Sequence, residues 1–162
     1  MISQAEVKRL FDYDPETGVF VRKISVASNA RAGQVAGNRH NKGYVTLRIN
    51  RRVFMAHQVA WLFANGEWPA GIVDHINGNK ADNRIANLRI GTKADNGQNQ
   101  REAHANSQSK TLGVCWNKRL NKWVAQIKCN GKVRHLGLFS DKTEAAEAYA
   151  KAKRELHPFC TL

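Results

Sequence analysis

Hydrophobic and polar positions change their period several times along the first half of the chain. Ser3 and Glu6 have the spacing of a capping box, which predicts a short helix through about Phe11. Residues 43–49 alternate Tyr, Thr and Arg with Val, Leu and Ile, the pattern of a half-buried strand. Further strands are expected at 19–21, 53–55 and 72–73, whereas no strong pattern marks residues 24–42.

A helical period takes over at residue 56. Val59, Leu62 and Phe63 then fall on one face, and a glycine at position 66 suits the end of the helix. His57 lies in the first turn of this expected helix. We expect it to be a buried, hydrogen-bonded structural residue rather than a catalytic one.

The second half of the chain predicts a small α+β module. A helix is expected from about residue 93 to 103, followed by a polar linker. Asn130 and Gly131 separate two alternating runs, which indicates a hairpin. A helix capped by Asp141 should follow, and the strand-like runs before it are 112–116, 123–128 and 133–139. We therefore expect a first domain at 1–104, with its core at about 56–104, a linker at 105–111 and a second domain at 112–162.

The charge balance points to a polyanionic partner. The chain of 162 residues carries 26 Lys and Arg against 13 Asp and Glu, a net charge of +13. Seven basic side chains and no acidic one fall between residues 105 and 140. Basic side chains on phosphates release condensed counterions, so nucleic acid is the expected partner. A small basic protein without such a partner is the alternative.

Cysteine usage and hydropathy argue against several classes of protein. Three cysteines without CxxC spacing argue against a disulfide framework and a structural zinc site. The N-terminus is too polar for a signal peptide, and no apolar run reaches membrane-spanning length. We expect a cytoplasmic protein with no membrane partner and no small-molecule cofactor.

The stretch 73–96 concentrates the candidate chemistry. Asp74 and His75 end an expected strand, Asn87 precedes a second one, and Asn96 lies in the helix beyond it. Carboxylate and amide oxygens suit Mg²⁺, and a neutral histidine beside them could take a proton from water. Neighbouring strand residues face opposite ways, however, which opposes a simple version of this site. A polar hairpin loop without catalytic chemistry is the alternative.

This stretch, DHINGNKADNRIANLRIGTKADNGQNQ, and the preceding AHQVAWLFANGEWPAG resemble the HNH endonucleases of the homing and phage type. The resemblance implies a ββα-metal (His-Me finger) fold. It implies His75 as general base, Asp74 and Asn96 as metal ligands, and Asn87 as the residue that positions the histidine and its loop. Asn96 stands where many members have His, a departure that this branch shares. Mg²⁺ or Mn²⁺ is then the expected cofactor, and the zinc-binding cysteine pairs of some HNH enzymes are absent.

Residues 112–159 resemble the plant ethylene-response-factor DNA-binding domain, through LGVCW, KWVAQI, HLGLF and TEAAEAYAKA. The resemblance implies a three-stranded antiparallel sheet in the DNA major groove, with one helix behind it. Cys115 departs from the usual arginine, so base preference does not carry over. We expect Trp123 to be mostly core. The implied DNA contacts are Trp116, Lys118, Arg119, Gln126, Lys128 and Arg134.

The expected function is a metal-dependent DNA endonuclease acting on double-stranded DNA. A non-catalytic DNA-binding regulator with a decayed nuclease fold is the first alternative. An RNA-binding or ribosome-associated basic protein would explain the charge but not the DHINGN stretch. The sequence does not indicate the target site, the number of strands cut, or the oligomeric state.

Overall fold

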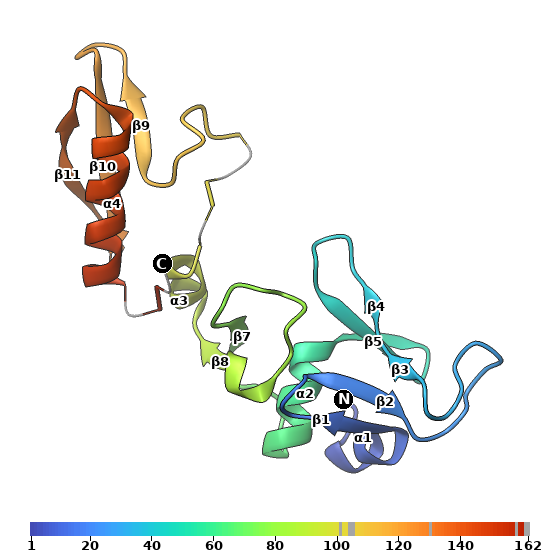
Figure 1. Cartoon of the computed structure of the whole chain (residues 1–162). Helices are drawn as coiled ribbons and strands as arrows, with labels where there is room; N and C mark the ends of the chain where they lie inside the picture. Colours follow the sequence, from blue (N-terminus) through green and yellow to red (C-terminus); the bar gives the residue numbers. More distant parts are fainter. Residues whose placement is uncertain (101, 104–105, 130, 158, 161–162) are drawn as a thin grey trace. The chain divides into compact units, whose positions relative to one another are not determined.

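Helices mix with small antiparallel sheets in this protein, as the computed structural model shows (Figure 1). The structure describes residues 1–100, 102–103, 106–129, 131–157 and 159–160. The chain divides into two compact units, Met1–Thr92 and Lys93–Leu162, each of which is described by itself. No helix within the described ranges has the length and apolar character needed to cross a bilayer.

The first unit contains eight short strands in three antiparallel sheets, with the orders β1-β2-β3, β4-β5-β6 and β7-β8. Two α-helices and a 3-10 turn complete it. The elements are α1 (Gln4–Leu10), β1 (Phe11–Asp14), β2 (Val19–Arg22), β3 (Val35–Ala36), β4 (Asn38–Arg39), β5 (Val45–Ile49), β6 (Arg52–Met55), α2 (Ala56–Asn65), β7 (Ile72–His75), η1 (Ile85–Asn87) and β8 (Leu88–Gly91).

An aromatic cluster holds the β1–β2 hairpin in the core of this unit. The Phe20 ring is buried, with its centroid 4.7 Å from that of Tyr13 and 6.5 Å from that of Phe63 on α2. Phe11 packs edge-on against the same ring at 6.1 Å. Rings at such separations contribute both buried area and favourable edge geometry. The hairpin is therefore fixed against the helix that precedes β7.

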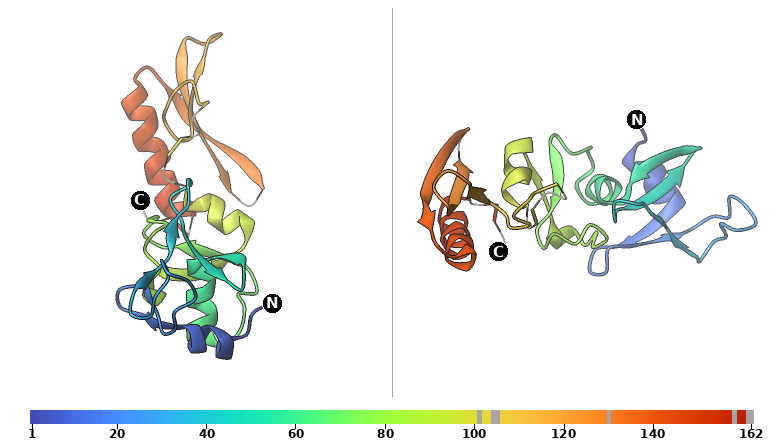
Figure 2. Two further views of the ribbon diagram at one scale, coloured as in Figure 1. Left: turned by 90° about the vertical axis from the view of Figure 1, so that its right-hand side faces the viewer. Right: turned by 90° about the horizontal axis from the view of Figure 1, so that it is seen from above.

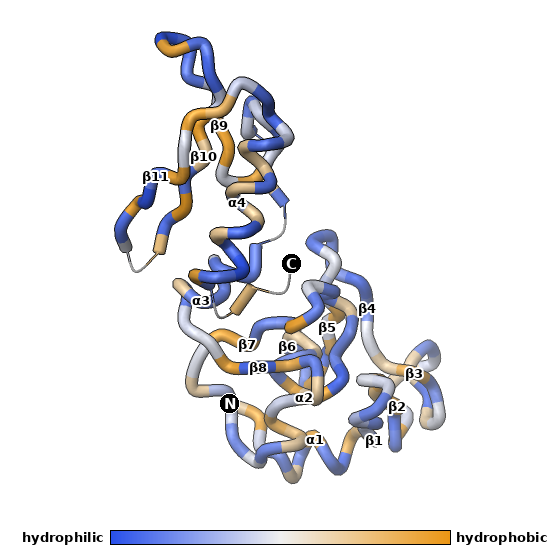
Figure 3. Tube along the Cα trace, turned by 60° about the vertical axis from the view of Figure 1, so that its left-hand side comes forward, coloured by the Kyte–Doolittle hydropathy of each residue, from blue (hydrophilic) through white to orange (hydrophobic). Residues whose placement is uncertain are grey.

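The second unit is a three-stranded sheet with a helix along one face (Figure 2). Ala145 of that helix packs against Ala125 and Val114, and the sheet order is β11-β10-β9. Strands β10 and β11 alternate in hydropathy, as expected for a sheet with one covered face (Figure 3). The elements are α3 (Lys93–Gln98), β9 (Val114–Asn117), β10 (Lys122–Cys129), β11 (Lys132–Phe139) and α4 (Lys142–Leu156).

Three predicted helix caps are confirmed. Ser3 caps α1 by accepting from the Glu6 amide, and Asp141 caps α4 through two backbone amides. Gly66 ends α2 in the left-handed conformation, where glycine is favoured. The predicted strands of the second module also form, but Asn130 of its hairpin lies outside the described residues.

The helix predicted through about Phe11 is confirmed, since α1 ends at Leu10 with Phe11 as its C-cap. Strand β1, in which Phe11 is buried against Phe20, was not predicted. The predicted length of the helix that begins at about residue 93 is wrong. The helix expected over 93–103 ends at Gln98, since Asn96 and Gly97 are weak helix formers. The second compact unit includes this helix, and the domain boundary at 105–111 stays a prediction.

Truncating the buried Phe20 should destabilise the first unit. Phe20→Ala is expected to cost about 3–5 kcal/mol in the free energy of unfolding, because it removes a ring from a packed cluster. Urea unfolding would measure this cost. Val35→Ala is the control, since Val35 on the neighbouring strand is 70% exposed, and it should change stability by less than about 0.5 kcal/mol. Equal costs for the two variants would contradict the role given to the cluster.

Candidate active site

Strands β7 and β8 form a two-stranded ribbon that carries two of the predicted site residues. Asp74 lies directly opposite Arg89, and His75 lies directly opposite Leu88. Successive residues of a strand point to opposite faces. The side chains of Asp74 and His75 therefore leave opposite sides of the ribbon, and each has its own surroundings.

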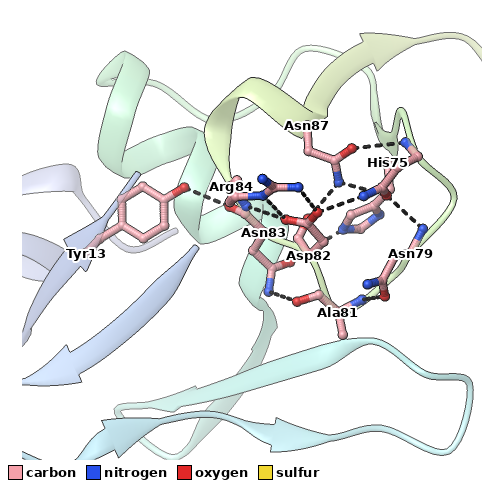
Figure 4. Close-up of polar contacts among 9 residues, drawn as sticks. Tyr13, His75, Asn79, Ala81, Asp82, Asn83, Arg84 and Asn87 are labelled. Carbon is pink, nitrogen blue, oxygen red and sulfur yellow. Dashed lines mark hydrogen bonds and ion pairs between the residues drawn. The ribbon is translucent and has the colours of Figure 1, made fainter. Parts of the chain in front are cut away.

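Asn87 closes the loop that connects the two strands (Figure 4). Its Oδ1 accepts from the Asn77 amide at 2.9 Å, and its Nδ2 donates to Asn77 Oδ1 at 3.0 Å. The same Nδ2 donates to the carbonyl of Asp82 at 2.9 Å. Asn87 is buried, and both of its amide hydrogens are used. One asparagine side chain thus ties the start of the loop to its middle.

Asp82 fixes the middle of the loop through its carboxylate. Its Oδ2 accepts from Arg84 Nη2 at 2.6 Å and from Asn77 Nδ2 at 2.7 Å. Hydrogen bonds from Arg84 are the main cause that lowers the pKa of Asp82 to about 2. The carboxylate is therefore ionised throughout the neutral range. Asp82 is therefore a structural residue of the loop turn.

His75 lies on the buried side of the ribbon. Its Nε2 is 3.4 Å from Asn83 Oδ1, and its ring centroid is 5.0 Å from that of His57 and 6.1 Å from that of Tyr44. Burial is the main cause that lowers its pKa, while the contact with Asn83 and the charge of Asp74 act in the opposite direction. A largely neutral imidazole at neutral pH follows from these surroundings.

His57 is buried, as predicted, but one of its two ring nitrogens does not make the expected hydrogen bond among the described residues. Its Nδ1 is buried and has no hydrogen-bond partner among the described residues. Burial, followed by the neighbouring His75, lowers its pKa to about 4. The ring stands nearly perpendicular to that of His75, at an interplanar angle of 83°. Two neutral imidazoles therefore pack directly against one another.

Asp74 lies on the other side and is paired with an arginine. Arg89 donates to Asp74 Oδ2 from Nε at 3.1 Å and from Nη2 at 2.9 Å. The described residues contain no group of three or more His, Cys, Asp or Glu side chains placed to hold a metal ion. An aspartate and an asparagine are hard oxygen donors. They fit an ion such as Mg²⁺, which needs few protein ligands because it keeps water and binds substrate phosphate.

The structure places three of the four predicted residues in the first unit. Asp74, His75 and Asn87 share the ribbon and its loop, whereas Asn96 lies exposed on α3 in the second unit. The place of Asn96 beside Asp74 stays a prediction. Sequence reasoning missed the contact between Asn83 and His75, because nothing in an eight-residue spacing through a polar loop indicates it.

All six predicted DNA contacts are exposed in the second unit, but the sheet divides them between its faces. Gln126 pairs with His135, and Lys128 pairs with Val133. Arg134 lies opposite the buried Ile127, so its side chain points to the face of the sheet opposite to that of Gln126 and Lys128. Trp116 is 40% exposed and packs edge-on against Trp123. Trp123 is partly buried against the core, which agrees with its expected place.

Comparison with known proteins identifies the class of the ribbon segment. Residues 54–98, which include all four predicted nuclease residues, match the family model described as HNH endonuclease. The chain is also 31% identical over 102 residues to protein 3.8 of Escherichia phage T7, an overlap of 62% of this chain and 83% of the phage protein. The chain therefore belongs to the family of that phage protein and carries an HNH endonuclease domain. No solved structure matches it.

His57 predicts a pH dependence of stability. The unfolded chain takes up a proton at His57 near pH 6.5, but the folded chain does so only near pH 4. Acidification between these values therefore favours the unfolded state, and the contribution is complete above about pH 6.5. Its size is on the order of 3 kcal/mol. In urea unfolding at several pH values, His57→Phe should lose less stability on acidification than wild type, and equal losses would contradict this assignment.

Proposed function

We propose that the protein is a metal-dependent DNA endonuclease that hydrolyses phosphodiester bonds at the β7–β8 ribbon. The observation that carries the proposal is the buried, neutral His75 at the end of β7, next to a loop locked by Asn87, within the segment that matches HNH endonucleases. Histidine in this state is a suitable general base at neutral pH. In a ββα-metal arrangement, the ribbon would be the two-stranded part and α3 the helical part.

Each residue has one task in the proposed reaction. His75 takes a proton from a water molecule as the water oxygen forms a bond to phosphorus and the bond to the leaving sugar oxygen breaks. Asn87 holds the loop that follows His75, and so fixes the path of the backbone that leaves His75. The tight packing of His57 against His75 excludes water from the inner side of the imidazole.

Asp74 and Asn96 are proposed to hold Mg²⁺ or Mn²⁺, with no zinc. The metal would supply charge stabilisation for the phosphoryl group and the leaving oxygen. Arg89 donates two hydrogen bonds to Oδ2 of Asp74, and it would keep this carboxylate oriented. A divalent ion that keeps most of its waters needs no further protein ligand.

Double-stranded DNA is the proposed partner, and the sheet of the second unit is the proposed docking surface. The six proposed contacts are Trp116, Lys118, Arg119, Gln126, Lys128 and Arg134. Gln126 and Lys128 lie on the face that α4 leaves open and are proposed as main contacts, whereas Arg134 points to the opposite face and is proposed as a weaker one. Lys118, Arg119 and Lys128 would bind phosphates, and Gln126 could hydrogen-bond a base edge. A regulator without catalysis is the alternative, and the cleavage experiment distinguishes it.

Plasmid cleavage tests the catalytic proposal. Wild type with Mg²⁺ or Mn²⁺ is expected to convert supercoiled plasmid into nicked or linear DNA. His75→Ala should lower the rate by about a hundredfold or more, because the general base is lost. His40→Ala removes a histidine outside the ribbon and should leave the rate unchanged. Absence of wild-type cleavage with either metal would favour the non-catalytic alternative, and equal rates for His75→Ala would remove His75 from the mechanism.

The two faces of the sheet give a matched test of docking. Lys128→Ala and Arg134→Ala each remove one positive charge from an exposed position, but on opposite faces. Lys128→Ala should weaken DNA binding roughly tenfold near 0.1 M salt and make the salt dependence shallower by about one phosphate contact. Arg134→Ala should have a smaller effect. Fluorescence anisotropy over a salt series measures both, and the reverse order would place DNA on the α4 side.

A further inference from the structure

Asn83 is the loop residue whose side chain meets His75. It is buried, and its Oδ1 lies 3.4 Å from Nε2 of His75. Its Nδ2 donates to the carbonyl of Ala81 at 3.3 Å, so the amide nitrogen faces an oxygen and the amide oxygen faces the histidine (Figure 4). An amide oxygen only accepts, and Nε2 must therefore carry the hydrogen. The lone pair of the neutral ring is then on Nδ1.

The backbone at Asn83 is held by the β1–β2 hairpin of the same unit. Tyr13 donates its hydroxyl to the carbonyl of Asn83 at 2.7 Å, in a buried hydrogen bond (Figure 4). The Ile85 amide donates to the carbonyl of Pro15 at 3.3 Å. Segments about 70 residues apart in the chain are thereby joined on both sides of Arg84.

Gly18 shows how closely the hairpin approaches. A Cβ atom at this position would lie 2.5 Å from the Arg84 nitrogen and 2.6 Å from the carbonyl carbon of Asn83. Both atoms belong to the backbone, so neither can move aside as a flexible side chain would. The φ of Gly18 is +72°, a conformation that also favours glycine. The turn of the β1–β2 hairpin is thus in direct contact with the backbone of Asn83 and Arg84.

The hairpin is itself rigid enough to serve as a support. Tyr13 packs between Phe20 and Phe63, at ring distances of 4.7 Å and 5.4 Å. Burial is the main cause that raises the pKa of Tyr13 to about 12. Its hydroxyl therefore stays protonated and remains a donor. A continuous set of contacts leads from the aromatic core through Tyr13 and Asn83 to His75.

We propose that Asn83 is a positioning residue that fixes the Nε2–H tautomer of His75, so that Nδ1 is the basic nitrogen of the proposed general base, and that the β1–β2 hairpin keeps Asn83 in place. The catalytic consequence rests on the proposed function, whereas the tautomer of His75 does not. The N-terminal hairpin would then form part of the support of the active site.

The tautomer is tested by NMR on the full-length ¹⁵N-labelled protein. Imidazole spectra are recorded at about pH 8, where neutral rings dominate, and His75→Gln assigns the signals of His75. Wild type should show the Nε2–H tautomer. Asn83→Leu, which has a similar volume and no acceptor, should shift His75 toward a tautomer mixture, while Asn83→Asp retains an acceptor and should preserve Nε2–H. Asn79→Leu, in the same loop without contact to His75, is the control.

Two results would overturn the role of Asn83. One is a wild-type His75 that is protonated on Nδ1, and the other is an unchanged tautomer in folded Asn83→Leu. Both readings are independent of DNA cleavage, so an inactive wild type would contradict the proposed function alone. Where wild type cleaves, Asn83→Leu should lower kcat on the order of tenfold to a hundredfold with KM nearly unchanged. Asn83→Asp should recover most of that loss.

The hairpin is tested with matched glycines. Gly18→Ala and Gly33→Ala both place alanine at a positive φ, +72° and +79°, but only the Gly18 Cβ meets other atoms within 4 Å. Gly18→Ala should shift the His75 imidazole signals, and Gly33→Ala should not. Tyr13→Phe removes only the hydroxyl, so it repeats the test if Gly18→Ala does not fold. His75 signals that stay unchanged in folded Gly18→Ala and Tyr13→Phe would overturn the role of the hairpin.

Discussion

Two neighbouring residues of a strand cannot direct their side chains to the same side, and this constraint organises the site. Asp74 and His75 are adjacent on β7, so the carboxylate and the imidazole leave opposite faces of the ribbon. Each then needs its own partners, because a buried polar group without one is costly. Arg89 serves the carboxylate, and Asn83 serves the imidazole. The proposed tasks of ion binding and proton transfer would then be separated by the geometry of the strand itself.

The histidine side of the ribbon shows how burial favours a neutral imidazole. His57 is buried, and its Nδ1 has no hydrogen-bond partner among the residues that the structure describes. Such an atom reduces stability. A second imidazole fills the space beside His75 without adding a charge, whereas a carboxylate there would raise the pKa of His75.

Local chemistry was predictable from the sequence, and long-range contact was not. Ser3 and Asp141 cap their helices because a capping residue acts on amides two or three positions away. The strand alternation that opposes a simple Asp74–His75 site was also readable, since it depends only on adjacency. The contact of Asn83 with His75, the bond from Tyr13 and the strand at Phe11 depend on packing between distant segments. No period or spacing in the loop encodes them.

The pair of Asp74 and Arg89 explains how the acidic side can exist before any cation binds. Asp74 is buried, and an unpaired carboxylate there would be unfavourable by several kcal/mol. Arg89 directs both Nε and Nη2 to the single oxygen Oδ2, so its charge is concentrated on one edge of the carboxylate. A cation that approaches the Asp74 carboxylate meets an oriented ligand. The nearby positive charge of Arg89 repels that cation. If Asp74 holds the metal as proposed, the affinity for a lone ion would thereby be reduced. An ion that arrives with an anionic phosphate would be favoured, because the phosphate offsets the charge of Arg89.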